Sequence, residues 1–178
     1  MNCSLRDEII DIFGLCDPSS LNLGSSPSWT QISIPETLII PEQKPDMEQI
    51  NSVNISVNIV RKKVIVTPTS PNGTKNWEGK KLTGRKLIVE GNLCQTVSYT
   101  ADVSVQSVHS AHFIVPFSAY IVIPSEISGE DTLNINFQVN ACVEDVFVKS
   151  VCKRKIFKNV TLLLQAVHAP IIGCPDEC

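Results

Sequence analysis

The sequence predicts an all-β protein: an antiparallel β-sandwich-like single domain with a short N-terminal helix and flexible, cysteine-bearing terminal arms. Three observations predict this fold. Apolar and polar residues alternate with period two in several β-branched stretches, which is typical of half-buried strands. Stretches rich in Pro, Gly and Ser separate them, as turns do. No convincing helical pattern follows residue 29, which favours a sandwich or a related β fold.

Length and composition set the class of protein. The chain has 178 residues, enough for one substantial core or for one domain with arms. Its 43% hydrophobic and 19% charged residues are typical of a globular protein. A formal net charge of −3 gives no general attraction to nucleic acid or to anionic membranes. The most apolar segment, residues 113–124, is short and contains Pro116, so no membrane span is predicted.

Residues 1–28 are expected to form an N-terminal arm. Within it, residues 4–15 are predicted to be helical, with Ser4 as the cap and Asp7 at the capping-box position. The apolar stripe of this helix consists of Leu5, Ile9, Ile12 and Phe13, and Cys16 continues it. A helix of this length is marginal alone in water, so the stripe is expected to dock, either on its own domain or on a neighbouring copy. The stretch "CDPSSLNLGSSPS" that follows is predicted to be a flexible link.

Residues 29–167 are expected to form the β domain, and residues 168–178 a C-terminal tail. In "NSVNISVNIV" and "TLNINFQVNACV", apolar residues alternate with asparagine, serine or glutamine, and "KLIVEGNLCQTVSYTADV" alternates more loosely. The asparagine- and glutamine-lined face of residues 134–140 lacks the lysines that commonly guard strands against pairing with other chains. This face therefore favours association over a strictly monomeric protein.

The seven cysteines are unusually placed for inert thiols, which are normally buried. Cys94 shares a strand face with Asn92, Thr96 and Ser98, and Cys142 lies with the asparagines, so both are expected to face outward. Four more cysteines fall in the arms, which makes six that are expected to be accessible: Cys3, Cys16, Cys94, Cys142, Cys174 and Cys178. Cys152 is assigned to no face.

The compartment in which these thiols would react is suggested by the N-terminus. "MNCSLRDEIIDIFGL" has acidic residues where a secretory signal has a basic segment, so no export signal is predicted. The cysteines then remain reduced bystanders, bind a metal, or oxidise after the producing cell has gone. Their pairing stays open, although with an odd number at least one thiol must be free or bonded to another chain.

Residues that could support chemistry are few. Cys174 and Cys178 could bind zinc with His168, but the second ligand pair of a structural zinc site is missing, so no metal site is predicted. His109 and His112 are three apart on a predicted strand and should point to opposite faces, which favours ordinary polar packing. The basic run "CKRKIFK" at residues 152–158 is predicted to be a solvated strand face rather than a nucleic-acid site.

Sequence motifs of enzymes are also missing. There is no phosphate-binding loop, dinucleotide-binding glycine pattern, zinc-protease helix or nucleophile elbow. A Cys/His hydrolase would need a thiol beside a base, and the sequence brings no such pair together. We therefore predict no enzyme activity, no catalytic residue, no cofactor and no small-molecule substrate.

Several stretches, in order along the chain, resemble the SPOCS domain of spore-forming clostridia and bacilli. They are "WTQISIPETLIIPEQKPDMEQINSVNISV", "GRKLIVEGNLCQTVSYTADVSVQSVHSAHFIVPFSAYIVIP" and "ACVEDVFVKSVCKRKIFKNVTLLL". The resemblance spans about residues 29–167 and implies a protein of the bacterial endospore envelope. In this family the domain often stands ahead of a LysM carbohydrate-binding module, which this sequence lacks. The resemblance implies no catalytic residues. It also implies synthesis in the mother-cell cytosol without a signal peptide.

Together these observations predict a structural, self-assembling protein of the spore surface: an exosporium lattice, a coat layer or a spore appendage fibre. Its partners would be identical copies, forming a homo-oligomer or polymer, and other spore-envelope proteins, with no nucleic acid and no membrane. Terminal arms would link the subunits, and the six accessible cysteines would form intermolecular disulfides after the mother cell lyses. Sheet, tube and fibre remain open. The alternative is a non-polymeric adaptor that recruits another coat protein through its β domain, and a weaker one is a metal-binding or thiol-based enzyme.

Overall fold

Two long β-sheets form the body of the molecule in the computed structural model, which describes residues 9–24, 28–75 and 79–168. One sheet has the strand order β1-β3-β4-β5 and the other β2-β9-β8, while β6 and β7 form a small hairpin. The strands are β1 (Asp11–Phe13), β2 (Trp29–Ile39), β3 (Met47–Thr69), β4 (Thr83–Ala101), β5 (Val108–Val122), β6 (Glu126–Ile127), β7 (Glu130–Asp131), β8 (Phe137–Cys152) and β9 (Lys155–His168). Short 3₁₀ turns, η1 (Pro18–Ser20), η2 (Pro71–Gly73) and η3 (Thr132–Asn134), complete the elements of the described ranges. The predicted all-β fold is confirmed.

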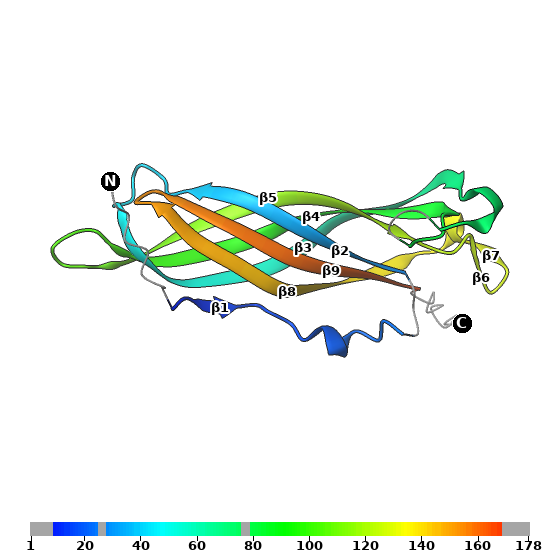
Figure 1. The fold of residues 1–178 in the computed structure, drawn as a ribbon, viewed down its shortest axis with the longest axis horizontal. Helices are drawn as coiled ribbons and strands as arrows, with labels where there is room; N and C mark the ends of the chain where they lie inside the picture. The colour runs from blue at the N-terminus through cyan, green and yellow to red at the C-terminus, as the bar shows by residue number, and fades with distance from the viewer. Residues whose placement is uncertain (1–8, 25–27, 76–78, 169–178) are drawn as a thin grey trace, which may run out of the picture.

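The strands are unusually long, and the molecule is correspondingly elongated (Figure 1). β3 has 23 residues and β4 has 19, whereas strands in globular proteins usually have about 5–6. Every pairing among the strands from β2 onward is antiparallel, and β1 pairs with β3 in parallel. Register shifts interrupt the β3–β4 pairing at four places, and such bulges increase the local twist.

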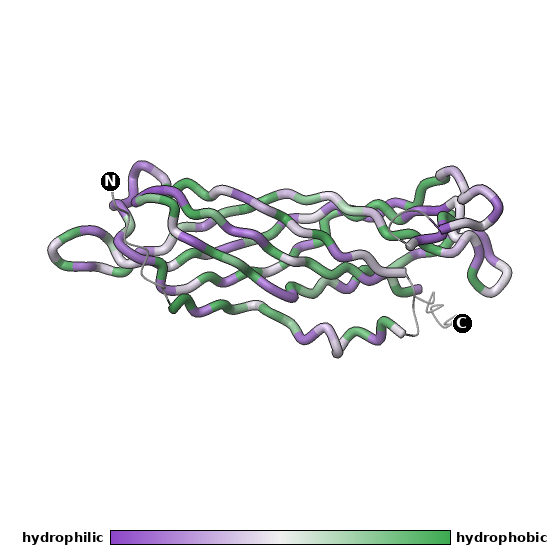
Figure 2. The backbone as a smooth tube through the Cα atoms, in the orientation of Figure 1, coloured by the Kyte–Doolittle hydropathy of each residue, from purple (hydrophilic) through white to green (hydrophobic). Residues whose placement is uncertain are grey.

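Alternation along the strands places the core between the two sheets. In β4, every second residue from Leu87 to Ala101 is buried, as the looser pattern of this stretch suggested. Figure 2 shows the same alternation of hydrophobic and hydrophilic residues along the backbone. Leu93 and Val97 from one sheet, and Val160 and Leu162 from the other, are completely buried and belong to one hydrophobic cluster. Burial of such side chains stabilises the fold by roughly 1.5–3 kcal/mol each.

The predicted N-terminal helix is wrong for the part of the arm that the structure describes. Residues 11–13 form β1, which pairs with Ser52–Asn54 of β3, and no α-helix occurs among the described residues. Ile12 packs against the core, whereas Ile9 is 94% and Phe13 is 54% exposed. These residues therefore do not form the continuous apolar stripe that the helix was predicted to have. Leu5 lies outside the described residues.

The cause of this difference is the free edge of β3. An edge strand offers unpaired N–H and C=O groups, and a short extended segment that bonds them gains more than a marginal isolated helix. Gly14 then turns the chain away with φ +93°, a conformation suited to glycine. A Cβ atom here would collide with the carbonyl of Ile55, so the close approach to β3 depends on glycine.

Residues 9–24, here called the N-terminal strap, continue along the sandwich beside β8 (Figure 1). The Cys16 N–H donates to the Val143 carbonyl at 3.0 Å, and the Gln165 side chain donates to the Asn22 carbonyl at 3.3 Å. Asp17 caps η1 by accepting from the Ser19 N–H at 2.9 Å. The strap therefore lies against its own domain in the part of the arm that the structure describes.

Gly91 gives a test of packing between β4 and β5. A Cβ atom at this position would lie 2.6 Å from Cζ of Phe117 and 2.8 Å from the carbonyl oxygen of Asn58. We expect Gly91→Ala to lower the free energy of unfolding by about 1–3 kcal/mol, because ring and backbone must both shift. Gly24→Ala is the matched control, since nothing lies within 4 Å of its Cβ position. Thermal melting checks this, and equal melting temperatures for the two variants would contradict it.

Candidate functional site

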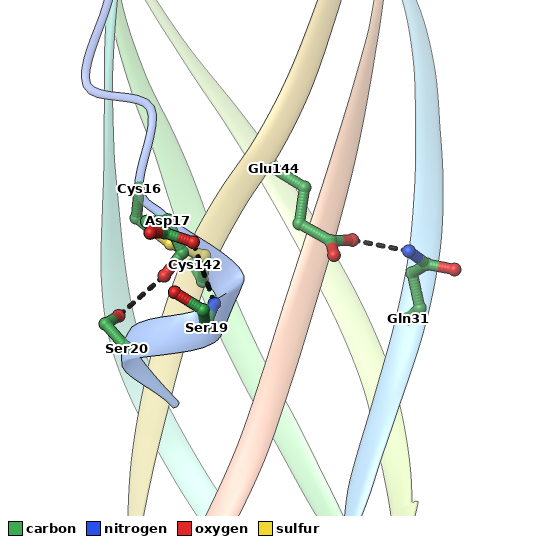
Figure 3. The surroundings of a disulfide bond; sticks show 7 residues. All are labelled: Cys16, Asp17, Ser19, Ser20, Gln31, Cys142 and Glu144. Atoms are coloured by element: carbon green, nitrogen blue, oxygen red, sulfur yellow. Dashed lines mark hydrogen bonds between the residues drawn. A yellow bond between two sulfur atoms is a disulfide. The ribbon is translucent and has the colours of Figure 1, made fainter. Parts of the chain in front are cut away.

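Cys16 and Cys142 form a disulfide within one chain, with Cα atoms 5.5 Å apart (Figure 3). Cys142 lies on the outward side of β8, next to core-facing Val143, as its alternation predicted. Its predicted accessibility is wrong, however, because the strap covers it and leaves the side chain only 1% exposed. The sequence placed both cysteines among the candidates for intermolecular bonds, whereas the structure pairs them with each other. The covering segment comes from 126 residues away, so local alternation could not reveal it.

Near this disulfide, polar side chains form hydrogen bonds on the outer surface of the three-stranded sheet. In the turn, the Ser20 hydroxyl donates to the Asp17 carbonyl at 2.7 Å. Gln31 on β2 donates to Glu144 on β8 at 2.5 Å, reaching across β9 (Figure 3). The strap therefore adds to a surface whose strands are already joined by side-chain contacts.

Cys94 lies at the centre of a surface that we call the Cys94 face. Strand register places it between Ser56 of β3 and Ile114 of β5. Its thiol is free and half-buried, and it lines a shallow hollow of about 290 Å³. The face consists of the outward-facing Asn54, Ser56, Cys94, Thr96, His112 and Ile114. None of these is Lys, Arg, Asp or Glu, and Ile114 is 70% exposed.

β5 forms one edge of the four-stranded sheet and has no Lys, Arg, Asp or Glu over its 15 positions. Val108 and Ile114 are 67% and 70% exposed on this strand. Monomeric proteins usually guard a long edge with charges, bulges or proline. Pro116 is the single such guard in β5, and no bulge interrupts its pairing with β4. The Cys94 face and this edge are continuous, because Ile114 belongs to both.

The structure describes only some of the remaining cysteines and of the residues considered as metal ligands. Cys3, Cys174 and Cys178 lie outside the described residues. Cys152, which the sequence assigned to no face, is free and exposed at the end of β8. His168 is exposed at the end of β9, and no group of three or more His, Cys, Asp or Glu that could hold a metal occurs in the described part of the chain.

The two histidines of β5 point to opposite faces, as predicted. His109 faces inward, where its ring stacks on that of Tyr99 at a centroid distance of 6.0 Å. Nδ1 of His112 lies 3.0 Å from the Thr96 hydroxyl on the outer face. They share no site, and both are accounted for by polar packing. None of the short helices in residues 9–24, 28–75 and 79–168 has the length and apolarity needed to cross a membrane.

The prediction that residues 152–158 form a solvated basic face is wrong at two positions. Lys158 is completely buried and pairs with Glu36 at 2.6 Å. Arg154 pairs with Asp46 at 2.5 Å and donates to the carbonyl of Pro41 at 2.7 Å, which fixes the β8–β9 turn. Lys153, in contrast, is exposed and pairs with a surface carboxylate.

Lys158, Glu36 and Gln95 form a buried polar cluster that sequence reasoning missed. Glu36 on β2 and Lys158 on β9 are register partners, and Gln95 reaches them from β4 in the opposite sheet. The Gln95 amide nitrogen donates to both carboxylate oxygens of Glu36, at 3.0 and 3.2 Å. Burial lowers the pKa of Lys158, and the hydrogen bond and charge of Glu36 oppose that shift only in part.

A signal for this cluster was present in the sequence. Glu36 lies in phase with Ile34 and Leu38, and Lys158 with Ile156 and Val160. Gln95 is likewise flanked by apolar residues two positions away, Leu93 and Val97. A polar residue in phase with an apolar stripe points inward with that stripe. What alternation could not show is that the three positions meet.

Comparison with known families supports the sequence resemblance. A family model described as SipL, SPOCS domain, matches residues 46–151, which is more than half of the chain. The match extends from the start of β3 nearly to the end of β8, and it leaves out the strap, β2 and β9. No curated protein and no solved structure matches significantly. The disulfide and the buried cluster each join residues inside the matched region to residues outside it.

Proposed function

The chain belongs to the SPOCS-domain family of spore-associated proteins, and from this premise we propose that it is a self-assembling structural protein of the spore surface. The observation that supports this most is the continuous surface formed by the uncharged edge of β5 and the Cys94 face. This surface contains exposed apolar residues and a free thiol, and it lacks the charges that keep edges apart.

Association through this surface would use backbone and side chains together. An extended segment of a neighbouring copy can add to a free strand edge, where main-chain hydrogen bonds supply affinity. Joining one surface of a copy to a different surface of the next copy propagates into rings or open filaments. The length of β5 provides an edge well beyond that of a typical strand.

Disulfides would then make the assembly permanent. A disulfide needs Cα atoms about 4.4–6.8 Å apart, so Cys94 on its rigid strand is bonded only where a neighbour brings a thiol to it. The arm residues Cys3, Cys174 and Cys178 are the thiols available for this, and exposed Cys152 is a second fixed receptor. Subunits would associate reduced in the mother-cell cytosol and become linked after lysis, when oxidant reaches them.

Electrophoresis and electron microscopy of the oxidised protein test this proposal. We expect a ladder of covalent oligomers on a non-reducing gel and ordered assemblies by negative stain. Replacing both fixed receptors (C94S and C152S) should remove the bonds between arm and β domain and so weaken the ladder, while the assemblies remain because the β5 edge is unchanged. T96S, on the same face, is the matched control and should behave as the wild type.

Two outcomes would decide against self-assembly. The first is a protein that stays monomeric by light scattering and shows only monomer on the non-reducing gel. The second is a monomer that binds another coat protein in a 1:1 complex, which would establish the adaptor function instead. Assemblies that form without any covalent ladder would contradict the disulfide linkage alone.

A further inference from the structure

The buried cluster brings an amine, a carboxylate and a carboxamide together inside the sandwich. Oε1 of Glu36 lies 2.6 Å from Nζ of Lys158 and 3.0 Å from Nε2 of Gln95. One carboxylate oxygen therefore contacts both the amine and the carboxamide. The three side chains come from β2, β9 and β4, so the cluster spans both sheets.

Water has little access to these groups. The side chains of Lys158 and Glu36 are 0% and 7% exposed, and Gln95 is 3% exposed. An ion pair in such surroundings loses the hydration of both charges, which favours transfer of the proton from the amine to the carboxylate. The resulting neutral amine is a nucleophile, whereas an ammonium group is not. The lowered pKa of Lys158 points in the same direction.

The carboxamide is poised as the acceptor of an attack. Oε1 of Gln95 is buried and has no hydrogen-bond partner among the described residues, although such atoms are nearly always paired. Both carboxylate oxygens of Glu36 face Nε2 of Gln95, so a carboxylic acid at Glu36 is placed to give its one O–H proton to that nitrogen when it departs.

We propose that Lys158 and Gln95 react to form an intramolecular amide bond between the two sheets, with Glu36 as the proton carrier. Glu36 takes a proton from the Lys158 ammonium, and Nζ then attacks Cδ of Gln95 while the carbonyl electron pair moves to Oε1. The Cδ–Nε2 bond breaks as the carbonyl reforms. Glu36 gives the proton that it holds to the departing nitrogen and takes the second amine proton in its place, and the ammonia carries that proton away as ammonium. One Nζ–Cδ bond replaces one Cδ–Nε2 bond, ammonia is released, and no oxidant or reductant is needed.

The bond would join β4 to β9 at the centre of the sandwich. These strands belong to different sheets, so no backbone hydrogen bond connects them. The cross-link also differs from the Cys16–Cys142 disulfide in being insensitive to reductant. It goes beyond the proposed assembly function, because it forms within each copy whether or not copies associate.

The mass of the purified, fully reduced chain tests this inference. We expect it to be lower than the mass calculated from the sequence by one ammonia. Trypsin should fail to cleave after Lys158 and should yield a branched peptide that contains Gln95 and Lys158. K158R, whose guanidinium does not act as a nucleophile at neutral pH, should show the full mass.

Two further variants keep the test decisive. E36A should show the full mass, and E36D, which retains a carboxyl group, should recover at least part of the bond and so separate loss of chemistry from loss of fold. N72A controls for the Asn72–Gly73 sequence, because an Asn-Gly pair can also lose ammonia by closing on its own backbone. A wild-type chain of full mass would overturn the inference. So would an ammonia loss that N72A abolishes, or a bond that forms equally well in E36A.

Discussion

Replacing Lys158 by methionine is expected to lower the free energy of unfolding by about 3–5 kcal/mol. Methionine keeps most of the side-chain volume, so the loss arises from the unpaired carboxylate of Glu36, and from the missing amide bond to Gln95 where that bond forms, rather than from a cavity. Glu36 would remain 7% exposed beside an apolar side chain, as a buried charge without its partner. Thermal melting should show a fall of about 10 °C in Tm, given the usual relation for a domain of this size.

The double variant E36Q/K158M distinguishes this cause from general damage to packing. The carboxamide that replaces the carboxylate of Glu36 carries no charge, and its carbonyl can still accept from the Gln95 amide. The double variant should therefore be more stable than K158M alone, because no charge is left unpaired. K155M is the matched control, since Lys155 lies on the same strand but is exposed. If K158M melted at the same temperature as K155M, the buried pair would not contribute to the stability of the fold.

Breaking the Cys16–Cys142 bond is expected to have the second largest effect. C16S/C142S should lose about 2–5 kcal/mol, because the bond closes a long loop and restricts the unfolded chain. Its two residues are 126 positions apart. Freed from the bond, the strap would be held by β1 and a few backbone contacts such as Cys16 N–H to Val143. Urea denaturation of oxidised protein measures the difference directly.

Reductant and a second pair of cysteines provide the controls. Reducing the wild type should reproduce the stability of C16S/C142S. The monomeric fraction of C94S/C152S should melt like the monomeric wild type, because neither cysteine takes part in the bond within the chain. Proteolysis near the strap should increase only where the bond is broken, since the segment then opens more often. A wild type whose stability does not respond to reductant would show that the bond does not form.

The β domain was predictable because its strands are long and amphipathic. Alternation needs only neighbouring residues, and it correctly oriented Cys94, His109 and His112. The strap was mispredicted because helical spacing at Leu5, Ile9 and Ile12 is a local signal, whereas pairing with β3 depends on an edge far along the chain. The helix propensity of a short segment affects its structure less than such tertiary contacts do.

The buried cluster shows a different limit. Phase with an apolar stripe indicates that Glu36, Gln95 and Lys158 point inward, but not that they touch. Their meeting depends on the β2–β9 register and on how the two sheets face each other. For Cys142, the alternation of apolar and polar residues predicted the correct side of β8. Its exposure was mispredicted because the strap covers it. The sequence therefore predicted which way a side chain points, and it did not predict contacts between segments that are far apart in the chain.

The direction of the strands also governs how the molecule would respond to tension. β1 lies toward one end of the long axis, β9 ends toward the other, and the strands run along that axis (Figure 1). Pulling on the strap loads Cys142 through the disulfide, and therefore loads β8. Pulling on the end of β9 draws it the opposite way along the same antiparallel ladder. The hydrogen bonds between these strands are then sheared together instead of opening one after another, which is the loading geometry in which a sheet resists rupture best.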